Sequence, residues 1–594
     1  MPNDHQGTIL SAQVEAIITA GLRPELFAGR GLLSASRTLI FAALTVLIIA
    51  GFGFRATGLS AEGLSEDELN KLNAVADYRA RGLTGANGEH PMLMKALQAA
   101  SIIVAEKWNN TSFVAAHPTE NIAPETALRF PGVVLGAFTA LLIYLVTAEL
   151  FGAEVALIAA ALWTFDPSAI GFSRVAKEDS FLLFFFLLAN VFWLKGQRVA
   201  ESTDQSPTRY YWLTAAAYGA MVASKYVPHL ISISFAYYWM FQQIPQTRWR
   251  LGTKRILKFF TVMGIVFLIL SPTILLPETW HQMGIFAGSK RISHDGYEFM
   301  GKLYTQRFDD WLDGVPVYFY LVFTLVKLPL LSVIGFLIGL PLLFRRKLGD
   351  GRYFIIVWLY FWVVAFCFPG GKFTRYYTTI LPAVLITSAL GIQFASRWLG
   401  KWIAKLASNT GLRQYAAASL AVIAIACSVV DSIQAGPHFR LFTNTLGGGT
   451  ARAGYYFPHD EFYDASMREV ISEIIRRAGP AAHIASESPL LASYYAQRDN
   501  RADLICVSLS DPAALQQLAI GDFVIVARGR RYFSNDGLIS SLAASAKPDF
   551  QIFLKSVPSV DVYVLNDTTL EKVKVVAQLR ASLKDKIFTN SSRE

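Results

Sequence analysis

Ten charged or ionisable side chains lie in the loops and short turns that connect long apolar runs of the sequence, or at the ends of those runs. A charged group at the edge of an apolar span is costly and tends to mark a pathway or a site. The ten residues are Asp67, Glu68, Glu89, His90, Arg174, Glu178, Asp179, Lys225, Lys372 and Arg375. Because they include both carboxylates and cations, they predict a polar site that can accept protons and bind anions.

The acidic cluster in the first loop also has a structural explanation. Ser65 followed three residues later by Glu68 fits a capping box, and acidic residues in a first turn suit the helix dipole. Apolar residues then recur at helical spacing, which predicts a helix from Ser65 onward. A second, amphipathic helix is expected from Met92 to about Glu106, directly after Pro91.

Other members of the set have alternatives of the same kind. Glu178 and Asp179 could pair with Arg174 one helical turn away, and we favour that structural role over a catalytic one. Glu89 and His90 could hold a divalent metal, but two ligands do not define a site. We therefore expect no essential metal or other cofactor, with a divalent cation as the open alternative.

Composition places these residues in a membrane protein. Apolar residues make up 53% of the 594 and charged residues only 16%, against averages of about 45–50% and about 25%. Three cysteines exclude a secreted disulfide scaffold of this size. The formal net charge of +10 does not indicate nucleic acid, because the basic residues fall between apolar runs and form no groove interleaved with aromatics.

The apolar runs predict eleven membrane spans, each near the roughly 20 residues needed to cross a bilayer. They are 37–57, 129–151, 153–171, 179–195, 209–224, 226–243, 256–275, 327–344, 353–369, 376–396 and 413–432. Lys and Arg residues gather before the first span and after the fourth, sixth, eighth and tenth, which predicts that these loops are cytoplasmic. The ten candidate residues then share the opposite, non-cytoplasmic face.

The predicted organisation has three parts. Residues 1–36 form a cytoplasmic N-terminal segment, and residues 37–432 form the membrane part with long outer loops at 58–128 and 276–326. From 433 onward, strands expected at 483–486, 504–509, 522–527, 550–554 and 561–565 alternate with helices at 464–477 and 490–496. This alternation predicts a small extracytoplasmic α/β domain at 433–594.

Five segments in one order resemble the protein O-mannosyltransferase and aminoarabinose-transferase-like membrane glycosyltransferases, which are glycosyltransferase family 39 with the GT-C fold. The segments are SEDEL, EHPMLMKAL, SRVAKEDSFLLFF, VYFYLVFTLVKLPLLSVIGFLIGL and KFTRYYTTILP. Met92 and Met94 stand where the family usually has a second Pro and a Gly. The resemblance covers roughly residues 35–430 and adds little on the C-terminal part.

The resemblance implies an inverting transfer of a sugar from a polyprenyl monophosphate carrier to an acceptor hydroxyl outside the cytoplasm. By motif position Asp67 would be the base, with Glu68 orienting it or capping the helix. Arg174, Lys225, Lys372 and Arg375 would stabilise the departing phosphate. Glu89, His90, Glu178 and Asp179 would support the substrate site.

The expected partners are the lipid-linked sugar donor, an acceptor of open identity and the lipid bilayer, in the inner membrane of a bacterium. A transporter or flippase of a lipid-linked saccharide is the alternative, although its charges would lie nearer the midplane and internal repeats would be expected. A receptor or assembly factor that works through its C-terminal domain is a third reading, and it leaves the acids of the first loop without a role.

Overall fold

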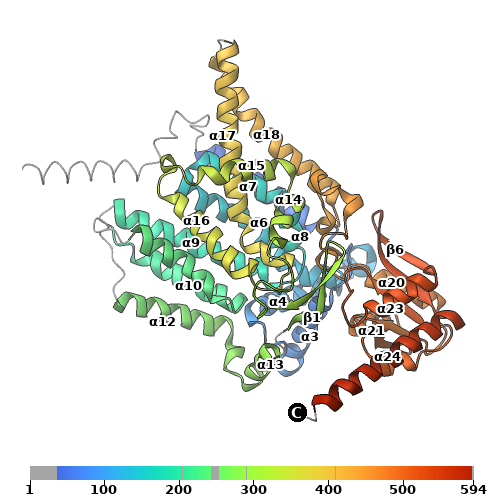
Figure 1. Cartoon of the computed structure of the whole chain (residues 1–594). Helices are drawn as coiled ribbons and strands as arrows, with labels where there is room; N and C mark the ends of the chain where they lie inside the picture. The colour runs from blue at the N-terminus through green and yellow to red at the C-terminus, as the bar shows by residue number, and fades with distance from the viewer. Residues whose placement is uncertain (1–36, 203–204, 243–252, 289–290, 408–409, 592–594) are drawn as a thin grey trace, which may run out of the picture.

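The computed structural model describes residues 37–202, 205–242, 253–288, 291–407 and 410–591. The predicted N-terminal segment 1–36 lies outside these residues. Most of the described chain is helical, and a small sheet with its own helices lies at one end of the helical part (Figure 1). The helical character and the C-terminal sheet therefore agree with the predicted fold class.

Four helices are long and apolar enough to cross a membrane: α2 (Arg37–Ala56), α6 (Pro124–Phe151), most of α9 (Glu178–Ser202) and the end of α18 (Thr410–Ala435). The chain is thus an integral membrane protein. Around them lie α10 (Thr208–Ser224), α12 (Thr253–Leu270), α14 (Phe319–Lys327), α15 (Leu330–Leu342), α16 (Gly351–Cys367) and α17 (Leu381–Ala407).

The predicted span 153–171 is not one straight helix. It consists of α7 (Ala153–Thr164) and α8 (Pro167–Ser173), which meet at an angle of 61°. Asp166 caps α8, since its side chain accepts a hydrogen bond from the backbone N–H of Ala169 at 2.8 Å. Pro167 then occupies the first helical position, where its missing N–H is tolerated. The stretch 226–243 is likewise divided, with α11 (Ile231–Tyr237) between shorter turns of other helix types.

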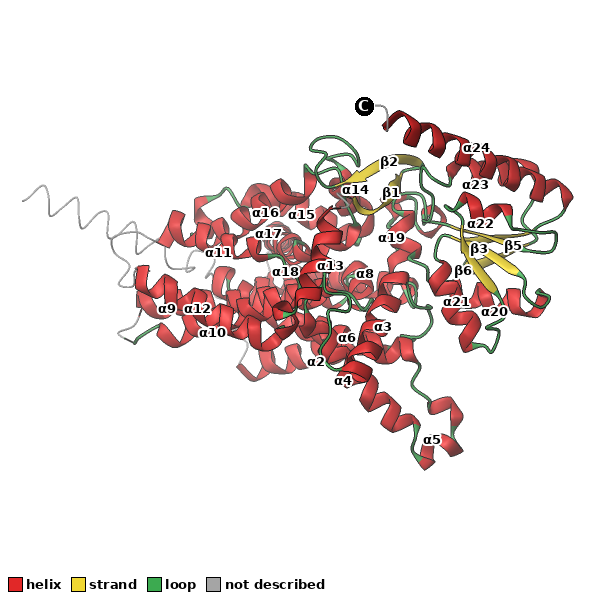
Figure 2. Cartoon of the chain, turned by 90° about the horizontal axis from the view of Figure 1, so that it is seen from below, coloured by secondary structure: helices red, strands yellow, loops and turns green. Residues whose placement is uncertain are grey.

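The first outer loop contains the two predicted helices. α3 (Glu66–Arg81) begins with the capping box, and α4 (Met92–Asn109) extends into α5 (Ser112–Ala116). Figure 2 shows α5 at the tip of an arm that points away from the rest of the molecule. The second outer loop holds α13 (Pro277–Gly288) and the antiparallel pair β1 (Arg291–Phe299) and β2 (Lys302–Arg307), which sequence patterning did not predict.

The C-terminal sheet has the strand order β4-β3-β5-β7-β6. β3, β4 and β5 are parallel, whereas β7 pairs antiparallel with β5 and β6. The strands are β3 (His483–Ser486), β4 (Ile505–Ser508), β5 (Phe523–Ala527), β6 (Phe550–Leu554) and β7 (Val557–Val564), and the helices are α20 (Met467–Arg477), α21 (Pro489–Arg498), α22 (Pro512–Gln516), α23 (Asp536–Ser545) and α24 (Asp567–Ser591). All five strands and the first two helices were predicted.

The hydrophobic core under α3 belongs to both ends of the chain. Leu64, Leu69 and Val75 from the first loop pack in one buried cluster with Ile471 of α20 and Tyr495 of α21. The Tyr495 hydroxyl also accepts a hydrogen bond from the backbone N–H of Leu64 at 2.6 Å. The C-terminal part is therefore packed against the loop that carries the acidic cluster.

Candidate functional site

Asp67 projects from the first turn of α3 and meets two donors from distant parts of the chain. The Lys177 ammonium lies 2.6 Å from Oδ2, and the Tyr463 hydroxyl donates to the same oxygen. Within the described residues Oδ1 receives no hydrogen bond. The Asp67 side chain keeps 37% of its surface exposed, so the carboxylate is not fully enclosed by these contacts.

The charge state of Asp67 follows from these neighbours. Burial by itself would raise the pKa of Asp67, but Lys177 and then Arg375 lower this pKa well below its ordinary value. The side chain is accordingly an ionised carboxylate at neutral pH, which is the form that accepts a proton.

Arg375 lines a pocket together with Lys177, the ion-pair partner of Asp67, and its charge acts on the Asp67 carboxylate. Its guanidinium stacks on the ring of Phe373 at 3.9 Å, and Nη1 is buried without a hydrogen-bond partner in the described part of the chain. The pocket is partly open to solvent and is lined by Phe172, Val175, Lys177, Asp179, Thr374, Arg375, Thr378, Arg440, Asp460 and Tyr463. A cation with an unused buried donor at such a wall can bind an anion.

Lys225 reaches the same region through Asp179. Its ammonium lies 2.6 Å from Asp179 Oδ1 and 5.0 Å from the centre of the Tyr376 ring. Asp179 lines the pocket, so Lys225 stands directly behind it. The structure thus brings together Asp67, Asp179, Lys225 and Arg375 of the predicted set.

Glu68 points away from the pocket. It forms an ion pair of 2.7 Å with Arg129, completes the capping box with Ser65, and accepts a hydrogen bond from the backbone N–H of Ala176 at 2.9 Å. Its side chain is buried. These contacts make it the link between α3, α6 and the turn before α9, so its helix-capping reading is confirmed.

Arg174 and Lys372 are occupied elsewhere and do not line the pocket. The Arg174 guanidinium donates to four backbone carbonyls, at residues 54 and 55 in the last turn of α2 and at residues 57 and 58 just after it. The Lys372 ammonium is buried and donates to the carbonyls of Val315 and Pro369. Both therefore hold backbone segments in place.

Glu178 has partners other than the one expected. It pairs with Lys71 at 2.8 Å and lies 3.3 Å from His90 Nδ1, and Asp179 pairs with Lys225, so the predicted pairing of both acids with Arg174 is wrong. The reason is that the Arg174 guanidinium donates to backbone carbonyls at the C-terminal end of α2 and just after it.

Glu89 lies at the edge of this network, where its side chain accepts a hydrogen bond from Asn87 at 2.5 Å. Among the residues that the structure describes, no group of three or more His, Cys, Asp or Glu side chains could hold a metal ion. The metal requirement stays a prediction.

Sequence reasoning did not single out Lys177, Tyr463, Asp460, Thr374 or Arg440. Lys177 stands inside the quoted segment SRVAKEDSFLLFF, and its position directly before two acids was a usable signal. Asp460 and Tyr463 carried no such signal in the sequence. Tyr463 bonds Asp67, which lies 396 residues earlier in the chain, and Asp460 accepts a hydrogen bond from the backbone N–H of Thr374 at 3.0 Å. Both contacts exist only in the folded chain.

Comparison with known proteins supports the resemblance found in the sequence. Residues 68–282 match the family model described as dolichyl-phosphate-mannose-protein mannosyltransferase, which confirms that resemblance over rather more than a third of the chain. The comparison with curated proteins gives no match.

Three solved structures illustrate the structural similarity. ArnT from Cupriavidus metallidurans bound to undecaprenyl phosphate is 13% identical, over 90% of this chain and 99% of that chain, with a TM-score of 0.49. The Archaeoglobus fulgidus oligosaccharyltransferase is 12% identical over 83% and 69%, with a TM-score of 0.47. The mycobacterial arabinofuranosyltransferase AftD is 13% identical over 90% and 42%, with a TM-score of 0.42.

Proposed function

On the premise that residues 68–282 carry the pattern of the dolichyl-phosphate-mannose-protein mannosyltransferases, we propose that this chain is a membrane glycosyltransferase. It moves a sugar from a polyprenyl monophosphate carrier to an acceptor hydroxyl on the non-cytoplasmic face. The observation that carries the proposal is the ionised Asp67 carboxylate, held by the pocket residues Lys177 and Tyr463, together with Arg375 of the same pocket, whose Nη1 is buried and unpartnered in the described part of the chain.

Asp67 is the proposed general base. As the acceptor oxygen bonds to the anomeric carbon, the hydroxyl proton passes to the carboxylate, and Oδ1 is the oxygen without a donor among the described contacts. The bond between the anomeric carbon and the carrier phosphate breaks, and its electron pair leaves with the phosphate. Attack from the side opposite the phosphate inverts the anomeric centre and needs no covalent enzyme intermediate.

Arg375 and Lys177 are the proposed phosphate ligands. The phosphate gains negative charge as the sugar departs, so fixed cations stabilise the transition state more than the ground state. Both residues line the pocket, and Lys225 adds charge from behind Asp179. Arg174 and Lys372 have no part in this assignment, because their donors are taken by backbone carbonyls.

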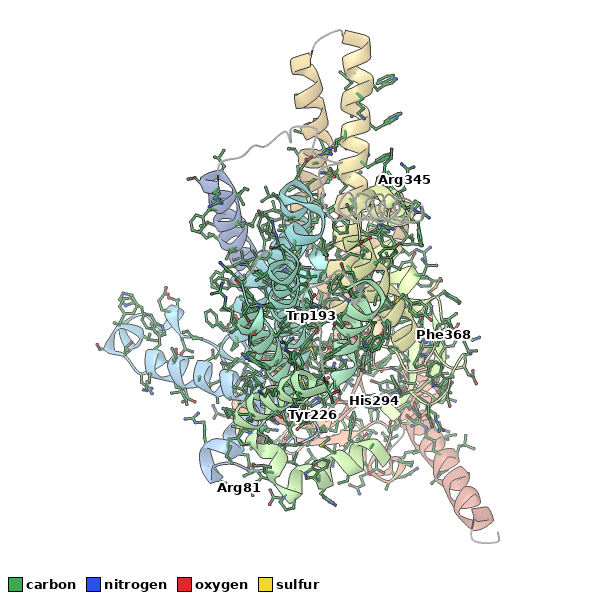
Figure 3. All side chains as sticks on the ribbon, turned by 90° about the vertical axis from the view of Figure 1, so that its left-hand side faces the viewer. Arg81, Trp193, Tyr226, His294, Arg345 and Phe368 are labelled. Atoms are coloured by element: carbon green, nitrogen blue, oxygen red, sulfur yellow. The ribbon has the colours of Figure 1, made fainter. Side chains whose placement is uncertain are left out.

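The proposed membrane arrangement keeps eleven spans, with the bent α7–α8 pair as one of them. Arg345, in a predicted cytoplasmic loop, lies at the opposite end of the helical part from Tyr226 and His294 (Figure 3). Tyr226 directly follows Lys225, so the site lies toward one end of the helical part and not at its middle. This placement favours an outward-facing enzyme over a transporter with a site at the midplane.

The direct test is the variant Asp67→Asn in full-length protein reconstituted in lipid nanodiscs. The probe donors are undecaprenyl phosphates carrying mannose or aminoarabinose, and the acceptor is an envelope extract from cells that lack the protein. Released undecaprenyl phosphate is measured by mass spectrometry. We expect the variant to lose about 10²- to 10⁴-fold in rate, the usual contribution of a general base.

Asp77→Asn is the matched control, since Asp77 lies on the same helix but pairs with Arg81 at the surface. It should transfer sugar at the unmodified rate. Turnover by Asp67→Asn at that same rate would exclude Asp67 as the base. Absence of release by the unmodified protein from every donor, together with unchanged lipid-linked sugar pools in cells that lack the protein, would exclude the transferase.

A further inference from the structure

The C-terminal part supplies a tyrosine to the proposed base. Tyr463 follows the short helix α19 (Pro458–Phe462), and its hydroxyl donates to Asp67 Oδ2 across a separation of 396 residues. Its side chain also lines the pocket, with the Arg440 guanidinium 5.3 Å from the ring centre. The Tyr463 side chain therefore forms part of the pocket wall while its hydroxyl donates to the Asp67 carboxylate.

The backbone that presents Tyr463 adopts an uncommon conformation. Tyr463 has φ 45° and ψ 49°, and Asp464 has φ 60°, so two successive residues with side chains lie in the left-handed region. Non-glycine residues rarely adopt this conformation unless surrounding contacts impose it. Here the conformation directs the phenol toward α3 while the chain continues into α20.

Contacts on both sides hold this turn. Arg530, which follows β5, donates through Nε to Asp464 Oδ1 at 2.7 Å. The backbone N–H of Glu66 donates to Asp464 Oδ2 at 3.2 Å, and the backbone N–H of Gly63 donates to Ala465 O at 2.9 Å. The residue before Asp67 and the residue after Tyr463 are thus joined by one hydrogen bond.

We infer that Tyr463 is a positioning residue for Asp67, through which the C-terminal domain orients the carboxylate and sets its basicity. This inference rests on the proposed function and extends it to a part of the chain outside the matched family region. Two donors on Oδ2 hold the carboxylate in one rotation and leave Oδ1 for the acceptor proton. A hydrogen bond to the charged form also favours that form.

Removal of the hydroxyl therefore has a defined direction. Without this donor the ionised carboxylate loses stabilisation, so the pKa of Asp67 rises and the acid limb of activity moves to higher pH. This substitution leaves unchanged the other charged or titratable groups that interact with Asp67, which are Lys177, Arg375, Lys71, Glu66, His90 and His294. A shift would consequently report the hydroxyl alone.

The first experiment measures sugar transfer by Tyr463→Phe against pH in the nanodisc assay. We expect a fall of about tenfold in kcat, an unchanged KM for the lipid-linked donor and an acid limb at higher pH. Tyr218→Phe is the control, because it removes a buried tyrosine hydroxyl that bonds Ser234, and neither residue lines the pocket. A Tyr463→Phe profile that superimposes on that of the unmodified protein would overturn the inference and leave the transferase standing.

A second experiment does not depend on turnover. Carbodiimide and glycine methyl ester label protonated carboxyl groups, so the labelling rate of Asp67 at pH 5, followed by peptide mass spectrometry, reports its protonated fraction. We expect Tyr463→Phe to raise this rate about tenfold relative to other carboxyls. In contrast, 3,5-difluorotyrosine at position 463, a stronger donor, should lower it. Equal rates in all three proteins would overturn the inference even where no donor is turned over.

Discussion

At the scale of single residues, the ionised state of Asp67 depends on its counter-ion. Lys177 is the nearest cation to its carboxylate, and Arg375 adds to the same electrostatic effect. A phosphate in the pocket would meet these same two cations, so binding of an anionic donor would draw Lys177 away from Asp67 and leave the base more basic. In the proposed function this ion pair would connect donor binding with proton acceptance.

The variant Lys177→Met tests this electrostatic role. Without the Lys177 charge, the effect of burial on Asp67 is less compensated, so the pKa of the carboxylate rises. As the pH is lowered, activity is then lost at a higher pH than in the unmodified protein. Lys177→Arg keeps the charge and should keep the acid limb near its original position. A pH–rate profile of kcat/KM measures both, and identical profiles for Lys177→Met and the unmodified protein would contradict the assignment.

Two arginines give a matched comparison for phosphate binding. Arg375→Met removes the unpartnered donor at the pocket and should lower kcat about 10²- to 10³-fold. Arg174→Met removes a guanidinium that donates hydrogen bonds to backbone carbonyls at the end of α2 and just after it. It should lower the melting temperature while the folded fraction keeps its kcat. A steady-state assay and melting curves of both variants separate the loss of kcat from the loss of stability. A large fall in kcat for Arg174→Met with an unchanged melting temperature would instead support Arg174 as a phosphate ligand.

At the scale of elements, α3 is placed by charges at its first turn. Glu68 joins its own N-cap, Arg129 of α6 and the turn that carries Lys177. The same residue that begins the helix therefore fixes the distance between Asp67 and Lys177. Glu68 therefore has a structural role beside Asp67, the residue for which we propose the role of general base.

The prediction for Glu68→Gln is a loss of stability. The substitution leaves the buried Arg129 guanidinium without its charged partner, which costs about 3 kcal/mol in comparable sites. Thermal unfolding in detergent, followed by intrinsic fluorescence, should show a lowered melting temperature. A large fall in kcat with an unchanged melting temperature would instead support a catalytic role for Glu68.

At the scale of the whole molecule, the C-terminal region completes the site. Tyr463 and Asp460 line the pocket, and α20 and α21 share a hydrophobic core with the first loop. Its role is therefore different from that of a separate module joined by a linker. Removal of this region would expose apolar residues of α3 and take away part of the pocket wall.

The proposed orientation predicts opposite labelling of two exposed positions. Cysteine is introduced at Asn110, in the first outer loop, or at Lys347, in a predicted cytoplasmic loop, after replacement of the native Cys367, Cys427 and Cys506. In intact spheroplasts a membrane-impermeant maleimide should label Asn110→Cys at once and Lys347→Cys only after permeabilisation. Labelling of both positions, or of Lys347→Cys alone, would contradict the proposed topology.

The sequence by itself determined the features whose energies are local. The apolar runs predicted where helices form, the Ser65–Glu68 spacing predicted the cap of α3, and alternating residues predicted all five strands of the C-terminal sheet. The segment motifs predicted the family pattern and placed Asp67 and Arg375 in one site. Hydrophobic periodicity and capping depend on neighbours in the chain, so they can be read without a fold.

Only the tertiary structure decided which charged groups face the pocket. Arg174 donates hydrogen bonds to backbone carbonyls at the end of α2 and just after it, and Lys372 donates to the carbonyls of Val315 and Pro369. Glu68 forms an ion pair with Arg129. A buried charge takes whichever partner the fold brings near it, and these partners come from segments up to 120 residues away. For the same reason Tyr463, which contacts Asp67 only in the folded chain, could not be found from local sequence.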